Sequence, residues 1–313
     1  MTALLRSKAT LTAAIRAGGR TVLMVNTRSR NGRRHYRRLP GRLAAAGVPV
    51  HTAVAIDDPA RLHQALTEVL ALDPDLLVFG GGDGSLAAAA GRLAYRDTAL
   101  GVLPLGTTNN FARSLGLPLD LSGAVAVLAG GKVADVDLGR AGEEVFANMV
   151  SIGLSVDVAR ATSSTLKRLL GRTAYTLTAL RRLPAHLPFK ATLTVDGIQQ
   201  VLWTHQLNVA NGAYHAGRRI ARDASVDDRL LVVYRLGDAG RLQVTRQTLD
   251  QVVRGPRRPL EAGRYLTARE LWVATDPTRS LDLDGEVRGT TPVRIGLLPN
   301  ALRVLVTSSF PDT

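Results

Sequence analysis

Four glycines and one aspartate lie in one short stretch, Gly80 to Ser85, which reads Gly-Gly-Gly-Asp-Gly-Ser. An apolar run at 76–79, typical of a buried parallel strand, precedes it, and an alanine-rich helical segment follows it. Glycine permits backbone angles and close approaches that side chains forbid, and the N–H groups at the start of a helix attract anions. The sequence therefore predicts a strand, a polyphosphate-binding loop and a helix capped by Ser85.

Asp83 stands out in this loop because its carboxylate would repel a bound phosphate. The repulsion is avoided if Asp83 holds a magnesium ion, orients a backbone amide or accepts a hydrogen bond from a ribose hydroxyl. A glycine-rich turn in which the aspartate only caps a helix is the alternative without a ligand. The residue types leave these alternatives open.

Two further loops have a similar composition. Residues 27–32 combine serine, asparagine and glycine with arginines that suit phosphates, and residues 103–113 are rich in small hydrogen-bonding side chains. Each follows a predicted strand, at 21–26 and 99–103. Because ligands of parallel sheets bind at the carboxyl ends of the strands, we expect the three loops to form one site.

The chain divides into two kinds of pattern. Up to residue 138, strands alternate with helices, which predicts an α/β domain with a parallel sheet; the elements are strands at 21–26, 48–54, 76–79 and 99–103 and helices at about 2–20, 33–46, 59–72 and 85–95. Residues 139–313 read mostly as strands and turns, typical of an antiparallel β-sandwich domain. The predicted strands lie at 133–138, 145–152, 189–195, 201–210, 230–236, 269–274 and 281–283.

Three further predictions concern the second domain and the end of the chain. An amphipathic helix at about 165–182 interrupts the second domain, and core packing is the more usual role of such a helix than membrane binding. Asp196-Gly197 predicts a hairpin turn. The last strands, at 293–297 and 302–306, are compatible with either domain.

The composition favours a folded protein without disulfides or zinc sites. The chain has 313 residues, 45% of them hydrophobic, and no cysteine. Its six histidines form no close pair on one helical face, so zinc is not expected. No apolar run reaches the roughly 20 residues of a spanning helix, and residues 1–20 lack the pattern of a signal peptide. We therefore expect a cytoplasmic protein.

Positive charge is high and unevenly distributed. The formal net charge is +14, and eleven cationic residues precede the first acidic one, Asp57. A second stretch without acids spans residues 158–195. Such stretches attract nucleotides, anionic membranes or nucleic acids. Since nearly all of these cations are arginine, an arginine-rich genome is an alternative source of part of the charge.

Four segments together resemble the diacylglycerol kinase catalytic family, and in particular its soluble bacterial lipid kinases of the YegS and DgkB type: Gly81–Ser85, Leu105–Arg113, Phe146–Gly153 and Leu283–Glu286. Gly-Gly-Asp-Gly alone is shared with NAD kinases, whereas the second and fourth segments make the resemblance specific. It runs from about Val22 to Leu305. It implies an N-terminal α/β domain and a C-terminal β-sandwich, with ATP and magnesium bound in the cleft between them.

The resemblance also implies site residues. Nucleotide-binding positions would be Asn26, Ser29, Thr52, Gly81, Gly82, Asp83, Gly84, Ser85, Gly106, Thr107 and Asn109. Three positions depart from the family pattern. Thr27 and Arg30 replace the proline and glycine of the usual first loop, and Asn110 replaces a common aspartate that binds magnesium.

A structural metal site is implied at Ser225, Asp228 and Leu230, where Asp228 would supply the carboxylate. Arg229 replaces the usual glycine there, and turn acids ahead of a strand are the alternative. Glu286 matches the proton acceptor of the family. On a continuing strand Asp284 would share a face with it and hold metal, whereas Asp-Gly also favours a hairpin turn.

The sequence thus predicts an ATP- and magnesium-dependent kinase that phosphorylates a lipid hydroxyl, with Asp83, Asp284 and Glu286 as catalytic candidates. A small-molecule kinase of the NAD kinase class is the first alternative. A basic nucleic-acid-binding protein is the second, but aromatic residues are only 4% and do not alternate with the cations, so no specific nucleic acid is expected. We expect the arginines to hold the protein reversibly at an anionic membrane, and a homodimer is compatible with the sequence.

Overall fold

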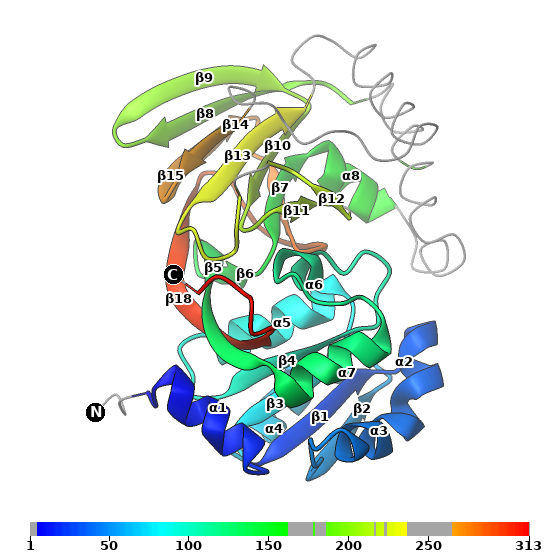
Figure 1. Cartoon of the computed structure of the whole chain (residues 1–313). Helices are drawn as coiled ribbons and strands as arrows, with labels where there is room; N and C mark the ends of the chain where they lie inside the picture. Colours follow the sequence, from blue (N-terminus) through cyan, green and yellow to red (C-terminus); the bar gives the residue numbers. More distant parts are fainter. Residues whose placement is uncertain are drawn as a thin grey trace. The chain divides into compact units, whose positions relative to one another are not determined.

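The computed structural model describes residues 5–161, 178, 186–215, 217–221, 224–236 and 265–312. The chain forms two compact units, shown with their labels in Figure 1. The first contains Met1–Leu138, Val226–Asp228 and Pro299–Thr313, and the second contains Gly139–Ser225 and Arg229–Leu298. The helix expected at 165–182 lies outside the described residues, apart from Thr178.

A parallel sheet forms the centre of the first unit, as predicted. Its strands follow the order β2 (Thr52–Ile56), β1 (Thr21–Asn26), β3 (Leu76–Gly81) and β4 (Ala99–Pro104), and the last part of β18 (Val293–Val306) joins β4 in parallel. Every residue of β3 and β4 is buried. Such uninterrupted burial requires layers on both faces of the sheet, which explains why these strands are continuous apolar runs.

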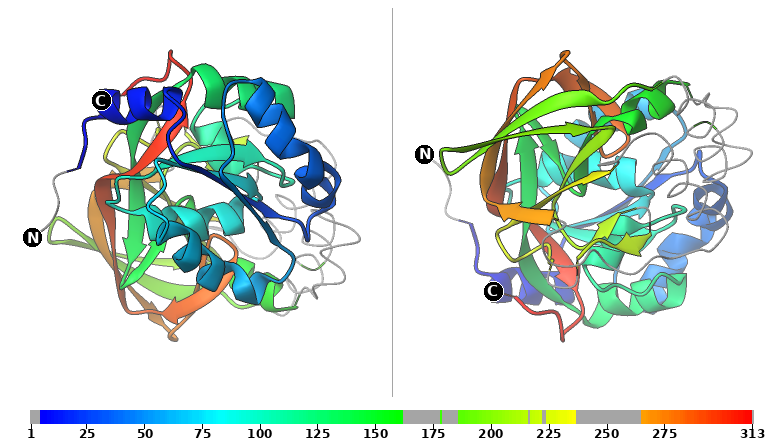
Figure 2. Two further views of the ribbon diagram at one scale, coloured as in Figure 1. Left: turned by 90° about the horizontal axis from the view of Figure 1, so that it is seen from below. Right: turned by 90° about the horizontal axis from the view of Figure 1, so that it is seen from above.

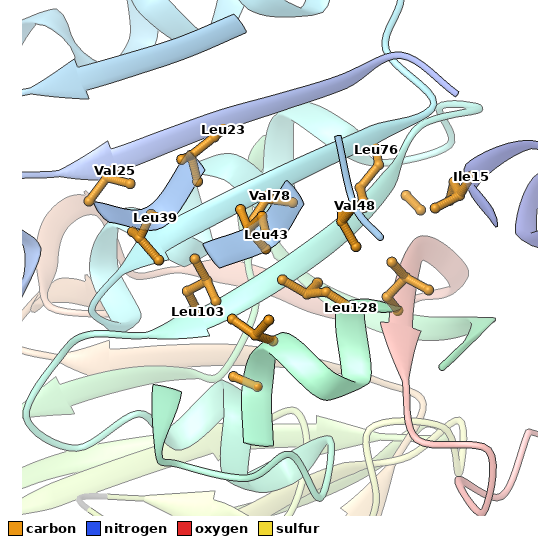
Figure 3. Packing of buried hydrophobic residues seen from close by; sticks show 14 of the residues in the cluster. Ile15, Leu23, Val25, Leu39, Leu43, Val48, Leu76, Val78, Leu103 and Leu128 are labelled. Atoms are coloured by element: carbon orange, nitrogen blue, oxygen red, sulfur yellow. The ribbon is translucent and has the colours of Figure 1, made fainter. Parts of the chain in front are cut away.

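Helices supply those layers (Figure 2). On one face α1 (Lys8–Arg16), α3 (Leu39–Ala45) and α7 (Leu121–Gly130) bury a cluster that includes Leu23, Val78 and Leu103 from the strands; Figure 3 shows this packing. On the other side α4 (Leu62–Leu70) contacts β2, and α5 (Asp83–Leu93) contacts β3 and β4. The helices on the two faces therefore exclude water from the strand residues between them.

The helix expected at 33–46 is divided into three pieces. The segment α2 (Arg30–His35) is followed by a 3-10 turn at Tyr36–Arg38 and then by α3. Pro40 lies in the first turn of α3, where its missing N–H is tolerated but would break a longer continuous helix. The helix expected at 59–72 is likewise a 3-10 turn at Pro59–Arg61 followed by α4.

The second unit contains two antiparallel sheets, which confirms the predicted β-sandwich. One sheet has the order β14-β13-β10-β7-β16-β17, and in the other the first part of β18 pairs with β15, followed by β8 and β9. The bounds are β7 Met149–Gly153, β8 Phe189–Val195, β9 Ile198–Thr204, β10 Gln206–Ala210, β13 Leu231–Leu236, β14 Tyr265–Ala268, β15 Glu270–Asp276, β16 Ser280–Leu283 and β17 Glu286–Thr290. One buried cluster takes residues from both sheets, including Ile152, Phe189 and Val273.

Several strand predictions need correction. The run at 145–152 is not one strand, because β6 (Glu144–Phe146) belongs to one sheet and β7 to the other. The apolar run at 201–210 is not one strand, because the chain passes from β9 to β10 at His205 and enters the other sheet. The runs at 293–297 and 302–306 are instead one long strand, β18, whose halves belong to different units. The helices α7 and α8 (Leu154–Ala161) were not expected. Apolar content alone does not show whether a run forms one strand, two strands or a helix.

Four further strands complete the described fold. The strand β5 (Lys132–Ala141) runs from the first unit into the second and pairs with β6 (Glu144–Phe146) and with β18. A small hairpin is formed by β11 (Tyr214–His215) and β12 (Arg218–Arg219). Among the described residues, no helix combines the length and hydrophobicity that crossing a bilayer requires.

Candidate functional site

Three loops meet at the carboxyl edge of the parallel sheet in the first unit. They follow β1, β3 and β4, which are neighbours in the sheet, and the register pairs Val25 with Gly80 and Gly81 with Pro104. The chain order of the sheet reverses between β1 and β3, and such a switch point is the usual place for a ligand in an open α/β sheet. The structure thus brings the predicted loops together.

The second and third loops approach each other more closely than side chains would allow. A Cβ atom on Gly106 would lie 2.5 Å from the Cα atom of Gly82 and 2.7 Å from Asn109 Oδ1. A Cβ atom on Gly81 would lie 2.8 Å from the Phe79 ring. These glycines are required by packing, and the loops consequently meet through their backbones.

Asp83 fastens the third loop to the start of α5. Its Oδ2 atom accepts a hydrogen bond from the Thr108 hydroxyl at 2.8 Å, and its Oδ1 atom accepts one from the Phe111 N–H at 3.1 Å. Phe111 lies in the short helix α6 (Asn110–Ser114). Of the three roles considered for Asp83, the geometry shows the orientation of a backbone amide.

Ser85 does not cap α5, contrary to the sequence prediction. The helix begins at Asp83, and its N-cap is Gly82, whose extended backbone starts the helix without a side-chain hydrogen bond. Ser85 therefore lies inside the first turn, and its Oγ atom accepts a hydrogen bond from Asn26 Nδ2 at 3.1 Å. This contact links the loops after β1 and β3. Gly84 occupies the first turn of the same helix.

The first loop is a compact turn despite its unusual residues. Ser29 caps α2 by accepting a hydrogen bond from the Gly32 N–H at 2.9 Å, and its hydroxyl donates to the carbonyl oxygen of Asn26 at 3.1 Å. The side chain of Asn26 accepts from the Arg28 N–H at 3.1 Å. Gly32 is required here, because a Cβ atom would lie 2.0 Å from the Asn26 oxygen. The loop keeps a capped geometry without the usual proline.

Asn109 stabilises the third loop from within. Its backbone is left-handed, with φ of 49°, and its buried side chain accepts from the Gly106 N–H at 2.9 Å and donates to the Gly106 oxygen at 3.2 Å. Thr107, by contrast, is exposed on the loop. Of the two predicted positions, Thr107 is therefore the one that faces outward.

Thr52 lies away from these loops. The sequence analysis placed it at the end of a strand at 48–54, but β2 begins at Thr52 and ends at Ile56. Thr52 pairs with Val22, whereas Asn26 pairs with Ile56. Four residues of strand correspond to about 13 Å, so Thr52 lies toward the opposite edge of the sheet. Its strand boundary depends on pairing with β1, which local composition does not reveal.

Asp284 and Gly285 form a turn in the second unit. Both have positive φ, 51° and 96°, and the flanking residues Leu283 and Glu286 pair as the ends of β16 and β17. This is the geometry of a two-residue hairpin. The continuing strand that would have aligned the two carboxylates is therefore wrong, and the hairpin alternative is observed.

The carboxylate of Asp284 binds a neighbouring backbone segment. It accepts hydrogen bonds from the N–H groups of Ala147, Asn148 and Met149 at 2.7, 3.0 and 3.1 Å. Burial of the carboxylate raises the pKa of Asp284 to about 6, although the hydrogen bonds from these backbone groups act in the opposite direction. Asp284 thus fixes the entrance to β7, and its oxygens already have donors.

Glu286 has a different environment. Its carboxylate accepts a hydrogen bond from the Arg288 guanidinium, and its side chain is 50% exposed. A half-exposed carboxylate is reachable by a substrate hydroxyl. Arg288 was not predicted as a site residue, although its spacing of two from Glu286 on a strand indicates a shared face.

The predicted metal site stays a prediction. Ser225 and Leu230 belong to the second unit and Asp228 to the first. Arg229 has φ of 59°, so the turn keeps the left-handed conformation that the usual glycine would favour. In the part of the chain that the structure describes, no three His, Asp or Glu side chains are grouped as a metal site.

Two family descriptions match the chain. "Diacylglycerol kinase catalytic domain" matches residues 20–141, and "YegS C-terminal NAD kinase beta sandwich-like domain" matches residues 148–306. Curated relatives carry the name "Probable lipid kinase YegS-like". The relative from Pseudomonas putida is 33% identical over 258 residues, or 80% of this chain and 83% of that protein. The relative from Enterobacter sp. strain 638 is 29% identical over 275 residues, with coverage of 85% and 89%.

Solved structures show the same fold. A crystal structure of a diacylglycerol kinase from Bacillus anthracis str. Sterne superposes with a TM-score of 0.75 at 24% identity and covers 92% of this chain and 97% of its own. Because the C-terminal family match alone covers about half of the chain and the P. putida relative spans most of both sequences, the chain belongs to the diacylglycerol kinase catalytic family, in its YegS-like group.

Proposed function

We propose that this protein is a lipid kinase that transfers the γ-phosphoryl group of ATP, in a magnesium-dependent reaction, to a hydroxyl group of a diacylglycerol-like lipid. The observation that carries the proposal is the match of both domains to the YegS-like group, together with relatives named as lipid kinases. The loops of the first unit and the hairpin of the second supply groups of the appropriate chemistry.

The loops of the first unit offer backbone groups that suit the phosphates of a nucleoside triphosphate. The backbones of Gly82 and Gly106 meet so closely that a side chain on Gly106 would fill the space, and α5 begins at this point. Backbone N–H groups at the start of an eleven-residue helix attract phosphate oxygens. Magnesium, when bound, would neutralise phosphate charge, with the exposed Thr107 and the half-buried Asn110 as neighbouring oxygen donors.

Glu286 is the proton acceptor in this mechanism. The oxygen of the lipid hydroxyl forms a bond to the γ-phosphorus of ATP, the bond from that phosphorus to the bridging oxygen breaks, and ADP leaves with the electron pair. The hydroxyl proton passes to the Glu286 carboxylate. Half-exposure of Glu286 leaves it accessible to the hydroxyl. Asp284 holds the turn on which Glu286 stands.

A pocket in the second unit is a candidate place for the acceptor. Its volume is about 520 Å³, and it opens between the edge strands of the two sheets, β9 and β14. Most lining side chains are aliphatic or aromatic: Leu193, Val201, Leu202, Leu207, Val233, Tyr234, Tyr265 and Leu266, with Gln200 and Arg235. The leucine and valine side chains offer contacts for an acyl chain, but the exposed surface of the pocket is more polar than apolar, so the choice between a lipid and a second nucleotide rests on the family match.

Labelled ATP and a panel of acceptors test the proposal. Purified protein is incubated with magnesium and detergent-dispersed diacylglycerol, monoacylglycerol, sphingosine or phosphatidylglycerol, and in parallel with NAD. We expect labelled phospholipid with at least one lipid and none with NAD. Labelling of NAD alone would favour the small-molecule kinase, and a gel shift with nucleic acid in the absence of any transfer would favour the nucleic-acid alternative.

We further propose that the enzyme reaches its substrate by reversible binding to an anionic membrane. Four exposed arginines lie in and after α2, at positions Arg33, Arg34, Arg37 and Arg38. They form no ion pair among the described residues, so their charge is available. Each cation near an anionic surface contributes about 1 kcal/mol, so four are sufficient for reversible attachment. The basic residues Lys167, Arg168, Arg181 and Arg182, expected to assist, lie outside the described residues.

Vesicle sedimentation tests whether these four arginines, rather than the net charge of the whole protein, bind the membrane. The quadruple variant with glutamine at 33, 34, 37 and 38 is compared with a control that loses the same charge at exposed Arg61, Arg96, Arg140 and Arg269. We expect wild type and control to bind vesicles in proportion to anionic content, with release at high salt, and the quadruple variant to bind weakly. Equal loss in both variants would contradict a specific surface.

A further inference from the structure

Arg288 connects two carboxylates in the second unit. It lies in β17, two residues after Glu286, and its Nη2 atom donates a hydrogen bond to Glu286 Oε2. Its Nη1 atom donates to Oε2 of Glu144, in β6, at 3.1 Å. We call Glu144, Arg288 and Glu286 the charged triad. The triad joins residues 144 positions apart, so it arises from the fold rather than from local sequence.

The geometry of a guanidinium explains why Arg288 can hold both glutamates of the triad in fixed positions. The group is planar and carries donors in a fixed arrangement, so one acceptor at Nη1 restricts where a second acceptor can bind at Nη2. Burial lowers the pKa of Arg288, but hydrogen bonds and charge from Glu144 and Glu286 outweigh it and raise that pKa above its ordinary value. Arg288 therefore remains a cation throughout the pH range in which a kinase works.

We propose that Arg288 is a positioning residue for the phosphoryl transfer: it holds the Glu286 carboxylate in one orientation toward the acceptor hydroxyl, and Glu144 holds Arg288. This inference rests on the proposed function, because it assigns Glu286 as the proton acceptor. A half-exposed glutamate without a partner occupies several rotamers, which place its oxygens at different positions. Fixing one rotamer raises the fraction of enzyme that is ready to react.

The alternative is an ordinary surface ion pair, and the second unit contains one for comparison. Arg294 contacts Glu270 at 3.3 Å, between the neighbouring strands β18 and β15, and its side chain is 66% exposed. Exposed pairs of this kind contribute little to stability. Replacement of Arg294 thus removes the same charge and a similar contact without touching the triad.

Steady-state kinetics of five variants test the proposal: R288Q, R288K, E144Q, the double variant E144Q/R288Q and the control R294Q. We expect R288Q to lower kcat about tenfold or more with an unchanged KM for ATP, because positioning acts on the chemical step. R288K should recover part of the loss, since it restores the charge but not the fork. E144Q should have a smaller effect, and the double variant should be no slower than R288Q, because Glu144 acts through Arg288.

The outcomes separate this inference from the proposed function. If wild type labels no lipid hydroxyl, the proposed function fails and the assignment to Arg288 fails with it. If wild type is active and R288Q matches R294Q, the triad is a surface ion pair and the inference alone is refuted. If the effects of E144Q and R288Q multiply, Glu144 does not act through Arg288. Thermal unfolding of each variant within a few degrees of wild type excludes misfolding as the cause of a low kcat.

Discussion

Asp83 in the first unit and Asp284 in the second both bind backbone N–H groups, whereas Glu286 in the second unit binds none within the described part of the chain. Asp83 in the first unit accepts hydrogen bonds from Thr108 and from the Phe111 N–H. Asp284 in the second unit accepts three from the backbone at 147–149. Glu286, two positions after Asp284, contacts a charged side chain and is half-exposed. The carboxylates of the predicted motifs thus either hold a loop in place through hydrogen bonds or lie partly exposed to solvent.

The difference has a physical origin. Backbone N–H groups that lie together must be paired, and an ionised carboxylate is a strong acceptor for several of them at once. Once bound in this way, its oxygens have fewer lone pairs left for a ligand. Among the described residues, the Glu286 carboxylate contacts the Arg288 side chain and accepts no backbone hydrogen bond, so its removal leaves no backbone N–H without an acceptor. We therefore expect substitution of Glu286 to change chemistry and substitution of Asp284 or Asp83 to change structure as well.

Replacement of Glu286 should give the largest effect on turnover. Glutamine keeps the size of the side chain but cannot accept the hydroxyl proton, so kcat should fall about 10² to 10⁴-fold. The KM for ATP and the melting temperature should stay close to wild type. Lipid phosphorylation kinetics and thermal unfolding measure both. A fall in ATP affinity with an intact kcat would assign Glu286 to the nucleotide site instead.

Replacement of Asp284 by alanine should affect both stability and activity. Three N–H groups lose their acceptor, and a hydrogen bond to a charged group contributes about 1.5–3 kcal/mol. A net loss of about 3 kcal/mol would lower the melting temperature by roughly 6–12 °C in a unit of this size. Calorimetry on the full chain provides the measurement. A stable but inactive variant would instead indicate direct participation in the chemistry.

The local parts of the fold were predictable from sequence, and the long-range contacts were not. Alternating patterns predicted the parallel sheet, and the glycine cluster predicted the junction of strand and helix, although β3 runs to Gly81 and α5 already begins at Asp83. Asp196-Gly197 was predicted as a hairpin turn and is one, with φ of 49° and 78°. The same dipeptide at 284–285 left two alternatives open, because the family match favoured chemistry where the backbone required a turn.

The contacts that define the candidate site lie beyond any local pattern. Thr108 is 25 residues from Asp83, and Glu144 is 144 residues from Arg288. No spacing rule connects such pairs, since the fold alone brings them together. Thr52 was misplaced for a related reason, because its strand begins where pairing with β1 begins. Residue types indicated the chemistry of the site but not which groups are already engaged.

Replacement of Gly106 by alanine should have an intermediate effect, confined to the first unit. The new Cβ atom would lie 2.5 Å from the Cα atom of Gly82, so the loops must separate. Overpacking of this kind costs about 1–3 kcal/mol, and about 1.4 kcal/mol corresponds to a tenfold rise in the dissociation constant of ATP. The matched control is Gly41→Ala in α3, where a Cβ atom would meet nothing within 4 Å. Nucleotide-binding fluorescence should distinguish the two variants, and equal affinities would contradict close contact of the loops as a requirement for ATP.

The smallest expected effect is on pH dependence, and it tests how the Asp284 carboxylate is balanced. Burial raises the pKa of Asp284 from an ordinary value of 3.8 to about 6, so the folded protein holds this proton more tightly than the unfolded chain does. The stability contributed by the protonated group is therefore fully present below about pH 4 and is lost as the pH rises through 6. D284N does not titrate and keeps one acceptor oxygen.

We accordingly expect the melting temperature of wild type, relative to that of D284N, to fall by a few degrees between pH 4 and pH 6 and to stay constant above pH 7. Thermal unfolding of both proteins in matched buffers measures the difference, and other titrating groups cancel because both proteins contain them. A difference that rises over this interval would mean that the three backbone N–H donors outweigh burial and lower the pKa of Asp284. In that case the carboxylate would be ionised at all working pH values, and its effect on the loop at 147–149 would be the same at pH 5 as at pH 7.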